Sequence, residues 1–207
     1  MTGRVVADLL RPTLRALSWG PPVAAVMAGL GIVAVPVLAG ARLDASGLTT
    51  LLRLTAVCGA LGGAFLLDDP AARVIAGTPT PRLLRQALRV AVALPLFAAG
   101  WWAATAIAGG RAALPIGGLT VEAATLLAVA LSVAAVWTRH ERSGAAGPAA
   151  ATTTLALAAL GAVVSDSVFP SPDDPGWDQI HLGWAAVLAI ALGVAVRAAS
   201  GFRLFRR

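Results

Sequence analysis

Residues 48–67 read LTTLLRLTAVCGALGGAFLL, and this stretch decides the fold. Its one charged side chain, Arg53, stands near the beginning. Each helical residue adds about 1.5 Å, so about twenty residues match the hydrocarbon core of a bilayer, roughly 30 Å thick. The apolar residues also surround the helix, whereas a surface helix of a soluble protein keeps a polar face. The stretch therefore predicts a transmembrane helix.

Five further apolar runs have similar length, at 22–41, 90–109, 118–138, 148–166 and 180–199. Of the 207 residues, 58% are hydrophobic and 13% are charged, and the mean hydropathy is +0.81. A soluble domain carries roughly a quarter charged residues. We therefore predict an all-α integral membrane protein with six transmembrane helices. The first run is too long, and begins too late, for a cleaved signal peptide.

The basic residues predict the orientation of these helices. All sixteen are arginine, which together with abundant Ala, Gly, Leu and Val is typical of a GC-rich bacterial genome. If the N-terminus is cytoplasmic, only Arg42, Arg53 and Arg111 fall at outward-facing ends. Positive residues favour the cytoplasmic side. The sequence thus predicts a multi-pass protein of the bacterial inner membrane with both termini inside, and the net charge of +6 does not indicate nucleic-acid binding.

Three parts of different character follow from this pattern. Residues 1–20 place apolar side chains at helical spacing, with charges on the other face, and predict an amphipathic helix in the membrane surface. Residues 21–200 form the six-helix transmembrane domain, and residues 201–207 a basic cytoplasmic tail. The charged face and the aromatic anchor of the surface helix consist of Arg4, Asp8, Arg11, Arg15 and Trp19.

The polar segment 68–89, between the second and third apolar runs, predicts a cytoplasmic loop with its own shape. Asp69 before Pro70 favours a helix start, and PAARVIAG at 70–77 is two turns long and ends at a glycine. The TPTP sequence that follows is stiff, and Arg82, Arg85 and Arg89 share one helical face. A shaped loop of this length favours a docking surface for a partner. The alternative is a loop that rests on anionic lipid headgroups.

Signatures of catalysis or of metal binding were not found. The chain lacks GxxxxGK[ST], and no Cys, His and Glu residues have metal-ligand spacing. Arg53 and Glu122 stand near outer ends of their runs and are expected to snorkel to the membrane surface. His140 and His181 have no nucleophile close in sequence. We therefore predict no catalytic, cofactor-binding or metal-binding residue, and an acidic extracellular loop at 166–180.

The DDPA sequence at Asp68–Ala71, the TPTPRLLRQALR that follows it, and the layout of a surface helix before six runs resemble the membrane subunit of an ABC-2 type (type V) exporter. The resemblance implies a short coupling helix in the cytoplasmic loop, docked on a separately encoded ATPase that binds ATP and Mg²⁺. It also implies two membrane subunits, as a homo- or heterodimer in the lipid, and export of a hydrophobic or amphipathic compound. The coupling residues would be Asp68, Asp69, Pro70, Arg73, Arg82 and Arg85.

Two other functions remain open from the sequence. A non-catalytic subunit of a membrane assembly or immunity complex predicts a membrane-embedded partner and no stimulated ATPase. A membrane-embedded lipid enzyme would depend on Glu122, His140 or an aspartate of the outer loop. Secondary transport is disfavoured because few ionisable residues lie within the runs.

Overall fold

The structure, a computed structural model, describes residues 12–68, 82–140, 146–163 and 168–200. These ranges contain helices and no strands. A helical turn at 12–16 precedes α2 (Gly20–Leu38), α3 (Ala45–Ala64), the 3₁₀ turn η1 (Phe65–Leu67), α4 (Arg82–Gly109), α5 (Ile116–His140), α6 (Gly147–Val163) and α8 (Trp177–Ser200).

Within these residues, five helices are long and apolar enough to cross a membrane: α2, α3 with η1, α4, α5 and α8. The predicted count of six is not confirmed, because the run predicted at 148–166 corresponds to α6, an apolar helix of 17 residues. The chain is thus an all-helical, multi-pass membrane protein by the length and composition of its helices.

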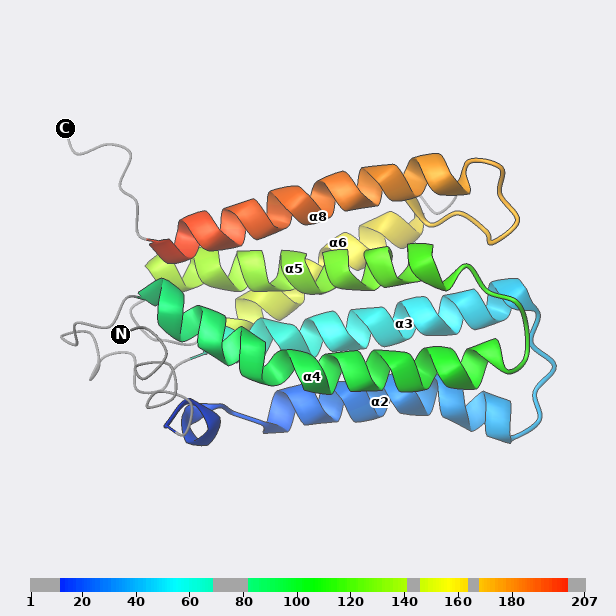
Figure 1. The fold of residues 1–207 in the computed structure, drawn as a ribbon, viewed down its shortest axis with the longest axis horizontal. Helices are drawn as coiled ribbons and strands as arrows, with labels where there is room; N and C mark the ends of the chain where they lie inside the picture. Colours follow the sequence, from blue (N-terminus) through cyan, green and yellow to red (C-terminus); the bar gives the residue numbers. More distant parts are fainter. Residues whose placement is uncertain (1–11, 69–81, 141–145, 164–167, 201–207) are drawn as a thin grey trace, which may run out of the picture.

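Successive helices run in alternating directions (Figure 1). At one end of the bundle α2, α4 and α6 begin, and α5 and α8 finish. This is the arginine-rich end, since Arg82, Arg85, Arg89, Arg139 and Arg197 stand in the terminal turns there. In the middle of the bundle α5 packs against α8 and α3, while α2 packs against α3 and α4.

Small residues bring α2 and α3 into close contact. Thr55 on α3 donates its hydroxyl to the carbonyl of Gly29 on α2 at 2.9 Å. An added Cβ on Gly29 would lie 2.9 Å from the Thr55 methyl, and one on Gly62 would collide with Ala25. The Ala25-x-x-x-Gly29 spacing therefore serves packing within this subunit, as small residues do at transmembrane helix contacts.

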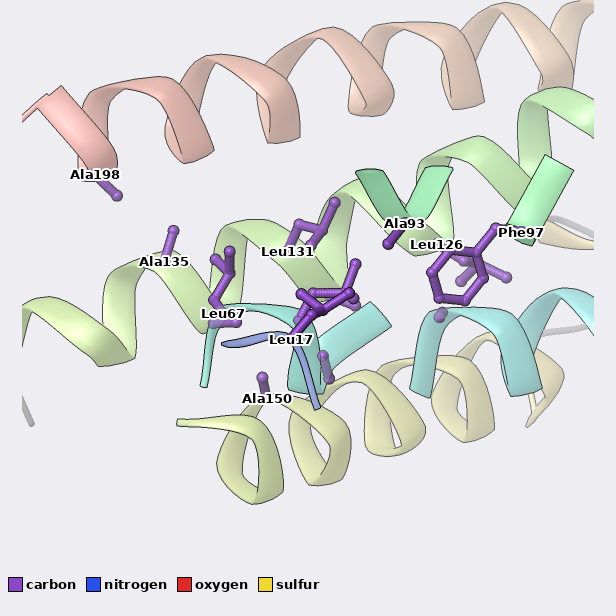
Figure 2. Packing of buried hydrophobic residues seen from close by; sticks show 14 of the residues in the cluster. Leu17, Leu67, Ala93, Phe97, Leu126, Leu131, Ala135, Ala150 and Ala198 are labelled. Atoms are coloured by element: carbon purple, nitrogen blue, oxygen red, sulfur yellow. The ribbon is translucent and has the colours of Figure 1, made fainter. Parts of the chain in front are cut away.

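The main buried cluster lies toward the arginine-rich end and collects side chains from most helices (Figure 2). Leu17, only 6% exposed, inserts there beside Leu67 and Leu131. Trp19 packs against the same cluster and donates its indole N–H to the Leu14 carbonyl at 3.0 Å. The segment before α2 is therefore fastened to the bundle, while Arg15 is exposed. Arg4, Asp8 and Arg11 of the predicted surface helix lie outside the described residues.

Candidate functional site

A buried ion pair joins α3 to α5 at the end opposite the arginine-rich one. Arg53 donates from Nε to Glu122 Oε2 and from Nη2 to Glu122 Oε1, both at 2.8 Å. The Glu122 side chain is 1% exposed and that of Arg53 15%. Both side chains were expected to snorkel to the membrane surface, and they instead pair with each other inside the bundle. Two parallel hydrogen bonds to a carboxylate are the strongest geometry available to arginine, and here they form away from solvent.

His181, near the beginning of α8, is the third member of what we call the Arg53–Glu122–His181 network. Its Nε2 lies 3.0 Å from Glu122 Oε1, and its Nδ1 lies 2.7 Å from the carbonyl of Trp177. A carbonyl and a carboxylate are both acceptors, so both contacts are hydrogen bonds when the imidazole carries two protons. Gly118 makes room for the ring, since a Cβ there would lie 2.8 Å from it.

The network also holds the segment before α8. Arg53 donates from Nη2 to the Pro170 carbonyl at 2.8 Å and from Nη1 to the Phe169 carbonyl at 3.3 Å. Its guanidinium lies 5.1 Å from the centre of the Phe169 ring. Trp184 adds a hydrogen bond from its indole N–H to the Val168 carbonyl at 2.8 Å. Thus one arginine ties α3, α5 and the predicted extracellular loop together.

This chemistry is that of a structural tie. Both Glu122 oxygens accept hydrogen bonds from Arg53, and the carboxylate is buried, so the pair joins α3 to α5. No group of three or more His, Cys, Asp or Glu side chains within the described ranges is arranged to hold a metal ion.

Sequence reasoning missed the network because its members are 59 and 69 residues apart. A signal was nevertheless present. In the predicted order of six alternating runs, the second, fourth and sixth all begin on the side predicted to be outer, and each carries one member of the network near its beginning. Opposite charges at equal depth in neighbouring helices are expected to pair, because an unpaired charge inside a membrane is unfavourable.

At the arginine-rich end, Asp68 joins three helices. Its Oδ1 accepts a hydrogen bond from the backbone N–H of Gly147 at 2.7 Å, which caps the beginning of α6. Arg89 of α4, 7% exposed, donates from Nη1 to the Asp68 carbonyl at 2.7 Å. Burial raises the pKa of the Asp68 carboxyl, against the hydrogen bonds from Gly147 and Ala146 and the charge of Arg89, which lower it. Asp68 therefore links the end of η1 to both α4 and α6.

Of the other predicted coupling residues, two lie in α4 and three lie outside the described residues. Arg82 and Arg85 stand in the first turns of α4, half-buried. Helix begins at Arg82, so residues 82–89, which the prediction placed in the loop, are the N-terminal turns of α4. Asp69, Pro70 and Arg73 lie outside the described residues, as does the predicted short helix at 70–77.

No protein-family model, no curated protein and no solved structure matches this chain. Its function is therefore inferred from its own residues.

Proposed function

We propose that this chain is the membrane-spanning subunit of an ATP-driven exporter of the ABC-2 type. It crosses the bacterial inner membrane six times, with α6 as the shortest crossing and both termini in the cytoplasm. A separate ATPase binds ATP and Mg²⁺, and a second membrane subunit completes the transporter. The cargo is hydrophobic or amphipathic, because the helices offer few charges to a polar solute.

The anchoring of Asp68 is the observation that supports this proposal most. Residues 69–81 connect η1, at the end of α3, to α4. Asp68, which directly precedes them, is hydrogen-bonded to α4 and to α6. A displacement of the connection therefore acts on three helices at once, as a coupling element requires. A connection needed only to join two helices is usually shorter and does not need to be bonded to a third.

ATP binding is coupled to transport through a difference in the free energy with which ATP binds the two conformations of the transporter. When ATP closes the ATPase pair, the docked connection moves, and Asp68 passes that movement to the N-terminal turns of α4 and α6. The bundle then favours the conformation in which the cargo path opens outward. ATP shifts this equilibrium only to the extent that it binds one conformation more tightly than the other.

The membrane-enzyme alternative receives no support from the site. Of the residues on which it would depend, Glu122 is 1% exposed and both of its carboxylate oxygens are bonded to Arg53.

Purification of the tagged chain from its native membrane tests the proposal. We expect a vanadate-sensitive ATPase to be purified together with the wild-type chain. At least about tenfold less ATPase activity should be purified with the Asp69→Ala/Arg73→Ala variant, because truncating one side of an interfacial charge pair costs about 2–5 kcal/mol of binding free energy. Asp68→Ala should keep the ATPase bound but change its hydrolysis rate, since the docking residues remain and the side-chain link to α6 is lost.

Asp173→Ala, an exposed aspartate at the opposite end, serves as the control and should behave as wild type. Retention of a membrane-embedded partner with no ATPase activity would instead support a subunit of an assembly or immunity complex.

A further inference from the structure

A cavity of about 220 Å³ lies at mid-depth between α4 and α5, with α3 beneath it. It exists because the facing positions are small. On α3 these are Ala56, Gly59 and Ala60, and on α5 Ala123 and Ala124. Even a Cβ added to Gly59 would lie 3.8 Å from the nearest atom, on the Phe97 ring. The cavity is therefore produced by the small residues at these positions, and larger side chains there would fill it.

The lining is uncharged and mostly apolar. Trp101 donates its indole N–H to the Thr120 hydroxyl at 3.1 Å, which in turn donates to the Ile116 carbonyl at 2.7 Å. The Thr55 hydroxyl is bonded to the carbonyls of Gly29 and Leu51. Since the threonine hydroxyls and the Trp101 indole are bonded within the protein and the lining carries no charge, the cavity favours an apolar occupant.

The opening of the cavity faces the lipid. Leu94, Ala98 and Trp102 line it at four-residue spacing on α4, and all three are exposed on the bundle surface. Leu94 is 49% and Trp102 58% exposed. These residues belong to a helix of spanning length, so the medium outside them is hydrocarbon.

We infer that this cavity binds one hydrocarbon chain of an amphiphile, which enters sideways from the bilayer between α4 and α5. An apolar cavity of about 150 Å³ holds benzene, so a space of 220 Å³ accommodates part of a single chain. The chain comes either from a membrane phospholipid or from a free single-chain amphiphile such as a fatty acid. The inference does not depend on the transport proposal, because it follows from the size, polarity and opening of the cavity.

Quenching of tryptophan fluorescence by brominated chains tests this inference on the full chain in phosphatidylcholine vesicles. Bromine quenches at contact, and Trp101 and Trp102 line the cavity. A brominated fatty acid or a brominated phospholipid is introduced at increasing mole fraction. A bound chain gives a saturable component at low fraction, whereas bulk lipid contact gives quenching in proportion to the fraction.

We expect a saturable component in the wild type and its loss in Ala124→Leu, which fills the cavity. Ala98→Phe, on the exposed rim, should also abolish it, and this variant does not disturb a buried position. Gly31→Ala is the control, because an added Cβ there meets nothing within 4 Å. Saturation by the fatty acid alone identifies a free amphiphile, and saturation by the phospholipid identifies a membrane lipid. Proportional quenching by both probes, or a saturable component unchanged in both cavity variants, would overturn the inference.

Discussion

Glu122→Ala is expected to lower the free energy of unfolding by about 3–5 kcal/mol, because it leaves the Arg53 guanidinium charged and without its carboxylate. The Arg53 side chain is 15% exposed, so water does not replace the lost partner fully. The change also removes the group facing His181 Nε2. Loss of the tie should loosen the segment at 168–176, which Arg53 holds through the Phe169 and Pro170 carbonyls.

Thermal unfolding of the purified protein in nanodiscs measures this effect. We expect Tm to fall by about 10 °C. The double variant Arg53→Met/Glu122→Leu removes both charges. It should lose less stability than Glu122→Ala, since no unpaired charge of the pair remains. Arg42→Ala, at an exposed arginine of the same end, serves as the control and should change stability by less than about 0.5 kcal/mol. Equal Tm values for Glu122→Ala and Arg42→Ala would show that the ion pair does not stabilise the bundle.

Gly62→Ala is expected to destabilise the contact between α2 and α3 by about 1–3 kcal/mol. The new methyl would collide with the Ala25 Cβ, which has no rotatable bond to move it aside. The carbonyl of Pro21 and the Cα of Pro22 are also within 3.3 Å of that position. Relief therefore requires α2 to shift as a whole, away from the hydrogen bond between Thr55 and Gly29.

A compensating change gives this prediction a sharp test. Ala25→Gly/Gly62→Ala moves the methyl group from one helix to the other, so it should recover most of the stability lost in the single variant. Gly31→Ala on α2 adds a methyl where nothing lies within 4 Å and should be close to neutral. If Gly62→Ala matched Gly31→Ala in Tm, the close approach of α2 and α3 would be incorrect.

The helices could be predicted from the sequence because each apolar run is limited by polar residues. The 48–67 run was placed close to its helix, which extends back to Ala45, since Asp44 caps the first turn by accepting a hydrogen bond from Gly47 at 2.8 Å. In α4, the helix begins eight residues before the apolar run. The arginine spacing had predicted one helical face for Arg82, Arg85 and Arg89. The helix start was nevertheless placed too late, because a search for apolar residues leaves out helical turns that carry charges.

The contacts that organise the site could not be predicted in the same way. Asp68 was expected only as a coupling residue of the cytoplasmic loop, and it caps a helix that begins 79 residues later. Nothing local in the sequence specifies that partner. Glu122 and His181 were considered singly, whereas the fold places them 3.0 Å apart. Such contacts depend on which helices are neighbours, and an apolar pattern locates a helix along the chain without specifying its neighbours.

Side-specific labelling tests most directly the central claim that residues 69–81 face the cytoplasm, where an ATPase can reach them. In a Cys58→Ser background, Thr80→Cys and Arg42→Cys are compared with a membrane-impermeant maleimide applied to intact cells. We expect Arg42→Cys to react from outside and Thr80→Cys to react only after the membrane is opened. Labelling of Thr80→Cys in intact cells would contradict the orientation and, with it, the proposed coupling to an ATPase.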